Sequence, residues 1–459
     1  MNWQDRKVLI IGAARQGLAL ARYLAGKGAQ VRVNDQRTPE QLQAAVDSLA
    51  GCAVAWILGA HPFSALDGVD LVCLSGGVPL TLPIVVEAQR RGLALSNDSQ
   101  IFMDLVPCPV IGITGSAGKT TTTTLVGRMT QAALALPRRA WIGGNIGLPL
   151  INDVDQMRAD DLVVLELSSF QLEQMTRSPQ VAAILNITPN HLDRHGTMEA
   201  YTAAKARLLA FQSAGDTAVL GRDDPGAWGL IEMVKGRLVS FGLRRPERGQ
   251  VGTFEADGTL WLQGADGDVP LMPRNLIRLR GEHNLRNVLA ACAVAAAAGL
   301  PVEAMRQAVE GFNGVAHRLE FVSRVNGADW YNDSIATAPE RTAAAVHSFD
   351  EPLVLMLGGR DKKLPWEDLA ALIHQRVDHV VLFGECAPKV QQALGQVEAG
   401  RRPYSVAVCA NLHEAVQAAA AVAGPGDVVL LSPGGTSYDE FRDFEERGER
   451  FRLWVKELL

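Results

Sequence analysis

Cysteine is sparse in this sequence and is not arranged in pairs. The 459 residues include six cysteines, which lie far apart without any C-x-x-C pair: Cys52, Cys73, Cys108, Cys292, Cys386 and Cys409. Such spacing predicts neither a disulfide framework nor a cysteine-based metal cluster. We expect most of these side chains to be small buried hydrophobes, and a reducing, cytoplasmic environment fits them best.

Long apolar runs and a strong excess of one charge are also absent. The most apolar helix-like segment, VLAACAVAAAAGL (288–300), is too short to span a bilayer. The N-terminal stretch MNWQDRKVLIIG lacks the long apolar region and cleavage site of a signal peptide. The net charge of −6 favours neither nucleic acid nor an anionic membrane as a partner. No sequence feature indicates an oligomer, so a monomer is expected.

What the sequence does contain is a regular alternation of strand-like and helix-like stretches. Strand-like runs open three series, at KVLIIGA (7–13), PVIGITG (109–115) and EPLVLMLGGRD (351–361). This β-α-β rhythm predicts mainly parallel sheets with helices on their faces. The stretch FEADGTLWLQGADGDVPL (254–271) alternates and carries turn signals, so it predicts a β-hairpin insertion. The expected fold is therefore α/β.

Two boundaries divide the chain into three expected domains. One lies near SNDSQ (96–100) and the other near GVAHRLE (314–320). The resulting domains cover residues 1–97, 98–314 and 315–459, and we expect the first and third to be Rossmann-like. A length of 459 residues agrees with about two to four domains.

The stretch GITGSAGKTTTTTLV (112–126) resembles a phosphate-binding loop with one letter displaced. The pattern G-x-x-x-x-G-K-[ST] places Ile113 where the first glycine belongs. A strand precedes the loop and a helix follows, so backbone N–H groups could cradle phosphates. Lys119 would reach the outer phosphates and Thr120 would bind Mg²⁺. The alternative is a capped helix after a glycine turn. We favour a P-loop ATPase domain.

A second glycine turn, IGAARQG (11–17), follows the first strand. Ala14 occupies the middle glycine position of the dinucleotide pattern G-x-G-x-x-G, which hinders close approach of a pyrophosphate. Asp35 stands at the end of the next strand, where a ribose partner is usual. The alternative is a tight turn that binds no ligand.

Several ionisable residues follow the central strands. Glu166 ends the apolar run LVVLE, and His191 and Asp193 lie just past the next strand. A carboxylate buried this way needs a partner or a metal. The alternatives are an incidental acid at a helix N-cap and a structural histidine. Lys205 lies in an amphipathic helix, where the default is a solvated surface charge.

Taken together, a series of stretches in order along the whole chain resembles the Mur ligase family. They are GITGSAGKT, GGNIG, ELSSFQLE, NITPNHLDRHG, AYTAAKARLL, GEHNLRN, HRLE, NDSIATAP and LSPGGTSYDEF. The resemblance is greatest to the branch that adds D-glutamate to UDP-N-acetylmuramoyl-L-alanine in peptidoglycan precursor synthesis. It implies that ATP activates a substrate carboxylate as an acyl phosphate, which the amine of the amino acid attacks. The three domains would then bind the UDP-sugar, ATP and glutamate in that order.

The resemblance also implies roles for individual residues. The catalytic residues would be Lys119, Asn145, His191 and Lys205, with Lys205 carried as a carbamate formed with CO₂. Two Mg²⁺ ions would be held by Thr120, Glu166 and His191. The ATP site would comprise Gly115, Ser116, Gly118, Lys119, Thr120, Thr121, Asn287, Arg318 and Asp333, with Asn284 in the same motif as Asn287. The UDP-substrate site would comprise Ala14, Arg15, Gln16, Asp35, Arg37, Ser75, Gly76, Gly77 and Asn145. Glutamate would bind Thr337, Lys362, Ser437 and Phe444.

One departure from the family pattern bears on the amino acid. The family usually has lysine where this chain has Ile335, and SPGGTS differs from the more usual version with a cysteine. The choice between D- and L-glutamate therefore stays open, and a related branch uses L-glutamate. Further alternatives are a sister muramyl-peptide or folylpolyglutamate ligase, a nicotinamide-dependent oxidoreductase, and a non-catalytic nucleotide switch.

Overall fold

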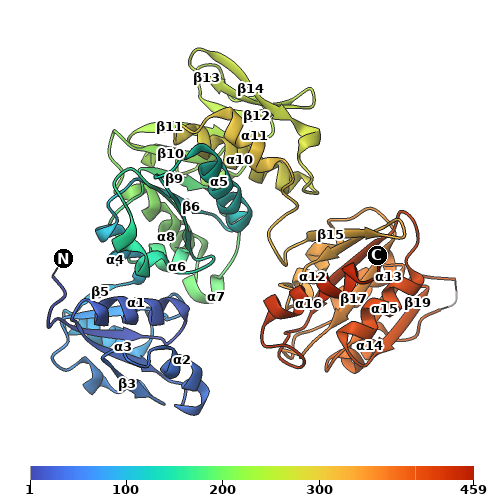
Figure 1. Cartoon of the computed structure of the whole chain (residues 1–459), viewed down its shortest axis with the longest axis horizontal. Coiled ribbons are helices and arrows are strands. Elements are labelled where there is room, and N and C mark those ends of the chain that lie inside the picture. The colour runs from blue at the N-terminus through green and yellow to red at the C-terminus, as the bar shows by residue number, and fades with distance from the viewer. Residues whose placement is uncertain (1, 399) are drawn as a thin grey trace. The chain divides into compact units, whose positions relative to one another are not determined.

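The computed structural model describes residues 2–398 and 400–459 (Figure 1). The chain forms two compact units, each described here by itself. The first holds the chain up to Arg278 together with Glu282–Gly311, and the second holds Leu279–Gly281 with Phe312–Leu459. The first unit contains two sheets and the second contains one.

The N-terminal sheet has five parallel strands in the order β3-β2-β1-β4-β5. The strands are β1 (Lys7–Ile11), β2 (Gln30–Asp35), β3 (Val54–Leu58), β4 (Leu71–Leu74) and β5 (Ala94–Ser96). Its helices are α1 (Arg15–Gly26), α2 (Gln43–Ser48) and α3 (Pro83–Arg90). Every residue of β4 is buried, as expected for a parallel strand covered on both faces. The strand order 3-2-1-4-5 is that of a Rossmann-like sheet without its sixth strand.

The central sheet has nine strands in the order β14-β13-β12-β11-β10-β9-β6-β8-β7. The parallel strands are β6 (Val110–Thr114), β7 (Ala140–Gly144), β8 (Leu162–Glu166), β9 (Val181–Ile184), β10 (Thr217–Gly221) and β11 (Arg237–Phe241). Then β12 (Gly252–Ala256), parallel to β11, pairs antiparallel with β13 (Thr259–Gly264), which pairs with β14 (Gly267–Pro273). The predicted hairpin is thus confirmed, and it extends the central sheet by a further antiparallel strand.

The helices around the central sheet carry five of the predicted site residues: Lys119, Thr120, Thr121, Lys205 and Asn287. These helices are α4 (Asp98–Leu105), α5 (Lys119–Ala133), α6 (Ser169–Leu172), α7 (Leu192–His195), α8 (Met198–Ala210), α9 (Pro225–Trp228), α10 (Glu282–Ala297) and α11 (Val302–Val309). The threonine run forms the buried start of α5, since Thr121, Thr122 and Thr123 are all buried. Packing in the tertiary structure thus overrides the low helix propensity of threonine.

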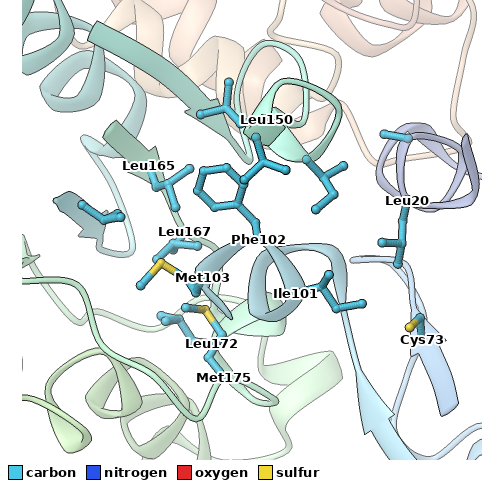
Figure 2. Packing of buried hydrophobic residues seen from close by; sticks show 14 of the residues in the cluster. Leu20, Cys73, Ile101, Phe102, Met103, Leu150, Leu165, Leu167, Leu172 and Met175 are labelled. Atoms are coloured by element: carbon cyan, nitrogen blue, oxygen red, sulfur yellow. The ribbon is translucent and has the colours of Figure 1, made fainter. Parts of the chain in front are cut away.

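One hydrophobic core joins the two sheets of the first unit. In Figure 2, Ile101, Phe102 and Met103 of α4 lie between a group from the N-terminal part, Leu20 of α1 and Cys73 of β4, and a group from the central part that includes Leu165 of β8 and Leu172 of α6. Asn97 caps α4 and also donates from Nδ2 to the carbonyl oxygen of Gln171 over 2.8 Å. The glycine turn and the phosphate-binding loop therefore belong to one packed body.

The second unit contains a six-stranded sheet in the order β15-β16-β20-β17-β18-β19. The strands are β15 (Glu320–Val325), β16 (Ala328–Asn332), β17 (Leu353–Gly358), β18 (His379–Phe383), β19 (Ser405–Cys409) and β20 (Val428–Gly434). Among the described strands of this sheet, only the β15–β16 pair is antiparallel. The helices are α12 (Pro339–Val346), α13 (Glu367–Arg376), α14 (Ala387–Leu394), α15 (Leu412–Val422) and α16 (Phe444–Lys456), and a hydrophobic core covers each face.

The α/β class and the three-sheet organisation are confirmed, whereas the domain boundaries at 97/98 and 314/315 stay predictions. All six cysteines are free; four are buried, and Cys52 and Cys409 are partly exposed. In the part of the chain that the structure describes, no helix is both long and apolar enough to cross a lipid bilayer.

Candidate active site

The phosphate-binding loop connects β6 to α5, and its glycines have separate structural reasons. Gly118 has φ +80°, and a Cβ atom there would lie 2.2 Å from Asn287 Oδ1. At Gly115 a Cβ atom would lie 2.9 Å from the Cβ atom of Leu185. The displaced Gly112 belongs to the strand, where a Cβ atom would lie 2.4 Å from Pro179 Cγ. The loop therefore has glycines at positions 115 and 118, where its backbone lies too close to neighbouring side chains for a Cβ atom. Gly112 instead allows β6 to pack closely against Pro179.

Two residues that sequence reasoning did not single out hold this loop in shape. Asn186 accepts from Ala117 N at Oδ1 over 2.8 Å and donates from Nδ2 to Ala117 O over 3.1 Å. The Tyr201 hydroxyl lies 3.0 Å from Ser116 Oγ, which also donates to Thr188 O over 2.9 Å. The available signals were the position of Asn186 after β9 and the i, i+4 spacing of Tyr201 and Lys205 on α8.

Both predicted active-site lysines contact the backbone of this loop. Lys119 Nζ and Lys205 Nζ each donate to the carbonyl oxygen of Gly115 over 2.9 Å. Lys205 is 1% exposed, so the alternative of a solvated surface lysine is wrong. Burial and, secondly, the charge of Lys119 lower the pKa of Lys205 to about 7, against the opposing effect of Glu166.

Glu166 and Asn145 form a pair at the ends of neighbouring strands. Asn145 donates from Nδ2 to Glu166 Oε1 and from its backbone N to Glu166 O, each over 2.8 Å. Glu166 is 1% exposed, and its Oε2 is buried with no hydrogen-bond partner among the described residues. An unpaired buried carboxylate oxygen is costly without a cation. The pair therefore fits Mg²⁺, and Thr120, at the start of α5, supplies a hydroxyl of the kind such an ion accepts.

His191 lies at the turn that begins α7. Its φ is +53°, and its ring meets Phe170 edge-on with centroids 5.1 Å apart. Phe170 follows Glu166 by four residues, so the chain brings His191 next to the segment that carries the buried carboxylate. The side chain of Asp193 lies outside the described part. Among the described residues, no group of three or more His, Cys, Asp or Glu side chains is arranged so that it could hold a metal ion. Mg²⁺ commonly completes its shell with water and phosphate.

In the N-terminal sheet, Asp35 is already engaged by the protein. Ala13 N donates to its Oδ2 over 2.8 Å, and Arg37 donates to both carboxylate oxygens over 2.7 and 3.0 Å. Burial alone would raise the pKa of Asp35, but these hydrogen bonds outweigh it and lower the pKa to about 2. Asp35 thus orients Arg37 and the glycine turn. Ala14 and Arg15 are exposed at the start of α1.

The loop after β4 lies beside this turn. Gly76 N donates to Gln16 Oε1 over 3.2 Å. Ser75 Oγ is buried without a partner in the described structure. Gly77 is exposed and Gly12, with φ +97°, packs against Ser75. The predicted UDP-site residues of the two loops are therefore brought together.

In the second unit, Asp333 and Arg318 lie at one end of the sheet. Asp333 accepts from Ser432 Oγ over 2.9 Å and from Leu319 N over 3.2 Å. Burial raises the pKa of Asp333 to about 7, while those bonds and the charge of Arg318 oppose the rise. Arg318 stands between His317 and Leu319, which both have positive φ. The backbone turn thus sets the direction of Arg318.

The residues predicted to bind glutamate lie in the same unit. Lys362 Nζ donates to Thr337 Oγ1 over 3.1 Å, and Ser437 is buried. Phe444 begins α16 and accepts from Ser334 Oγ over 2.8 Å. Ile335 is half-buried and donates from its backbone N to His317 O over 3.1 Å.

Sequence reasoning missed Arg447, which is fully buried in the second unit. Its guanidinium donates to Ser334 Oγ over 3.0 Å, to Ser334 O over 2.8 Å and to Gly435 O over 3.1 Å. Burial lowers its pKa to about 10. Arg447 therefore ties the NDSIATAP segment to the SPGGTS segment. An arginine in a helix that also carries several surface charges gives no sign of this burial.

Comparisons with known proteins cover the whole chain. Three family models match in order: Mur ligase MurD-like, N-terminal domain over residues 6–96, Mur ligase middle domain over 113–295, and Mur ligase, glutamate ligase domain over 317–435. Proteins named UDP-N-acetylmuramoylalanine--D-glutamate ligase are similar over full length. The one from Symbiobacterium thermophilum is 41% identical, covering 99% of this chain and 98% of the relative. The one from Pelotomaculum thermopropionicum is 40% identical, covering 100% and 99%.

Solved structures share the fold at lower identity. UDP-N-acetylmuramate-alanine ligase from Thermotoga maritima aligns with a TM-score of 0.57 at 18% identity, covering 98% of this chain and 99% of that one. A pseudomurein peptide ligase from Methanothermus fervidus aligns with a TM-score of 0.52 at 16% identity, covering 99% and 100%.

Proposed function

Because the chain belongs to the Mur ligase family, we propose that it adds D-glutamate to UDP-N-acetylmuramoyl-L-alanine with hydrolysis of ATP to ADP and phosphate. The reaction is a step of peptidoglycan precursor synthesis. The structural observation that supports the proposal is the position of Lys205. This lysine is buried and donates to the same carbonyl oxygen of the phosphate-binding loop, that of Gly115, as Lys119 does. A loop that only bound nucleotide would not need a second, buried lysine there.

ATP would be held by the loop and the start of α5. The N–H groups at Gly118 and at the N-terminus of α5 suit phosphate oxygens, whereas those of Ser116 and Ala117 donate to Asn186 and hold the loop in shape. The ammonium of Lys119 donates to Gly115 O and Ser116 O in this structure and could exchange these carbonyls for phosphate oxygens. Asn287 lies next to the loop, since a Cβ atom at position 118 would lie 2.2 Å from its Oδ1.

Mg²⁺ would neutralise the charge that spreads over the transferring phosphoryl group. Glu166 Oε2 and the Thr120 hydroxyl would hold one ion, and His191 a second. The buried, unpartnered Oε2 supports the first assignment. The contact between His191 and Phe170, close in sequence to Glu166, supports the second.

Lys205 would react with CO₂ to form a carbamate. The ammonium first loses one proton, and the neutral amine then forms an N–C bond with CO₂ and releases a second, so that a cation becomes an anion. A pKa lowered to about 7 leaves a large share of the amine neutral at physiological pH. The carbamate would remove the repulsion between the ammonium groups of Lys119 and Lys205, which both donate to the carbonyl oxygen of Gly115.

The chemistry would proceed in two displacements. The alanyl carboxylate attacks the γ-phosphorus, which releases ADP and forms an acyl phosphate. The glutamate amine then attacks the carbonyl carbon, loses a proton, and phosphate leaves. Asn145, fixed by Glu166, would orient the reacting carboxylate. Asp35 and Arg37 would help to bind the UDP moiety, and the ammonium of Lys362 would pair with a glutamate carboxylate.

The decisive experiment measures ADP and phosphate release with each amino acid. Release should require both UDP-N-acetylmuramoyl-L-alanine and D-glutamate. Turnover with L-glutamate but not with D-glutamate would support the second candidate, which is the same ligase chemistry with the other enantiomer. This candidate is retained because Ile335 replaces the lysine usual in the family. Turnover with another amino acid and none with glutamate would reject both assignments. Dependence on NAD without ATP would reject the ligase class.

A further inference from the structure

The loop after β4 is pressed against the first glycine turn. Val78 N donates to Ser75 O over 2.9 Å, which closes a tight turn. A Cβ atom at Gly12 would lie 2.9 Å from both Ser75 Cβ and Val78 Cγ2, and Gln16 accepts from Gly76 N. One side of this loop is therefore held by the N-terminal sheet itself.

The other side of the loop is held by an arginine from the central part of the first unit. The guanidinium of Arg194, in α7, donates to Gly77 O over 2.8 Å and also to Val78 O. These are charge-assisted bonds from two nitrogens to consecutive carbonyls. A planar guanidinium matches such a pair of acceptors, whereas a lysine ammonium fixes no plane. Arg194 thus sets both the position and the orientation of the loop.

The same guanidinium packs on a ring that also contacts His191. The Arg194 Cζ lies 4.6 Å from the centroid of Phe170, and the Phe170 and His191 rings meet edge-on with their centroids 5.1 Å apart. Phe170 is therefore a shared support for the arginine that holds the substrate loop and the histidine predicted to bind metal.

Phe170 is itself held against His195. The two rings stack with centroids 5.3 Å apart and an interplanar angle of 9°. His195 is fixed at both nitrogens, since Nε2 lies 3.0 Å from Ser169 Oγ and Nδ1 lies 3.1 Å from Glu173 Oε1. A ring fixed in this way transmits displacement rather than absorbing it, because packed side chains leave little free space.

We propose that Arg194 is a positioning residue that couples the UDP-substrate loop at residues 75–78 to His191 through Phe170. The proposal rests on the proposed function, because it takes that loop as the substrate loop and His191 as a metal ligand. Arg194 touches no reacting atom and acts through the backbone carbonyls and the Phe170 ring. Ordering of the loop by substrate would then steady His191, and metal at His191 would steady the loop.

The test compares Arg194→Met and Arg194→Lys with the full-length wild-type chain. Calorimetry should show the Kd for UDP-N-acetylmuramoyl-L-alanine rising about tenfold in Arg194→Met, since two charge-assisted hydrogen bonds are lost. Electron paramagnetic resonance of Mn²⁺ with ADP present should show metal affinity falling about tenfold, the scale of losing a support behind a ligand. Arg194→Lys should fall between wild type and Arg194→Met. The Kd for ADP without metal should not change.

Arg177→Met is the matched control. Arg177 also donates to a backbone carbonyl, that of Met103 over 3.1 Å, but it contacts no predicted site residue in the described structure. This variant should bind substrate and Mn²⁺ as wild type does. Thermal unfolding of each variant checks folding, and if Arg194→Met unfolds early, Arg194→Lys decides the matter.

The outcomes separate this proposal from the proposed function. Failure of the wild-type protein to bind the UDP-sugar would reject the function. Wild-type binding with an unchanged Kd in Arg194→Met would overturn the positioning role. Loss of substrate affinity with unchanged Mn²⁺ affinity would overturn the coupling to His191.

Discussion

The ammonium groups of Lys119 and Lys205 donate to the same carbonyl oxygen, that of Gly115, each over 2.9 Å. Two like charges on one acceptor repel each other, and burial disfavours the charged form of Lys205 further. The pKa of Lys205 is lowered to about 7 by burial and by Lys119. Lys205 is therefore placed to be neutral or modified.

Replacing Lys205 by alanine should lower ligase activity about 100-fold or more, because an anion next to the phosphate site is lost. Short carboxylates such as formate or acetate should restore part of the activity by occupying the vacated space. Lys235→Ala is the control, since Lys235 is exposed and its Nζ donates to Ala210 O. Undiminished activity of Lys205→Ala would remove Lys205 from the mechanism.

Stability should respond to the titration of Lys205 in CO₂-free buffer. Its pKa falls from 10.5 to about 7 on folding, so between these values the unfolded chain binds the extra proton. The stability contributed by this residue therefore rises with pH across that window, and the penalty is greatest below about pH 7. Lys205→Met should show a smaller rise in thermal midpoint from pH 7 to pH 10, by about 3 °C. Equal slopes for both proteins would contradict the lowered pKa.

Glu166→Gln should lower kcat about 100- to 1000-fold, the scale of losing one preorganised charge contact. Glutamine keeps the oxygen that accepts from Asn145, so the fold should stay intact while the unpartnered anionic oxygen is lost. Mn²⁺ binding should weaken in parallel. Glu255→Gln, which alters a hairpin carboxylate that accepts from Gly258 N, should behave as wild type. Unaltered Mn²⁺ affinity in Glu166→Gln would exclude the residue as a metal ligand.

Gly118→Ala should abolish nucleotide binding while leaving most of the fold intact. The added Cβ atom would lie 2.2 Å from Asn287 Oδ1, and the backbone would hold an unfavourable φ of +80°. A fluorescent ADP analogue should show the Kd rising about 100-fold, given a strain of a few kcal/mol at the loop. Gly258→Ala is the matched control, because Gly258 has φ +70° in open space. Normal ADP binding by Gly118→Ala would place the nucleotide elsewhere.

Local patterns were enough to predict the elements of the site. The apolar run before GSAGK predicts a strand and the threonines a helix start, and these are β6 and α5. Chain-neighbour information suffices there, because a glycine turn between a strand and a helix is built from consecutive residues. The same reasoning placed Glu166 at a strand end. It could not show that Asn145 occupies one of its oxygens and leaves the other buried and unpartnered.

The position of Asp35 in the sequence was not enough to predict its hydrogen-bond partners. Its place at the end of β2 suggested a ribose partner, yet Ala13 N and Arg37 engage both of its oxygens. Asn186, Tyr201 and Arg447 escaped prediction because their partners lie far along the chain. Tyr201 meets Ser116 across 85 positions, and Arg447 meets Ser334 across 113.

The order of residues along the chain determines the α/β rhythm and the family and predicts the phosphate-binding loop, because each depends on neighbours within a few positions or on motifs in a fixed order. Tertiary structure alone decides that Lys205 is buried beside Lys119 and that Arg194 reaches the loop at residues 75–78. Desolvation and Coulomb interaction depend on every group that folding brings near, whatever its place in the sequence. The charge state of a lysine and the partner of an arginine are therefore properties of the folded chain.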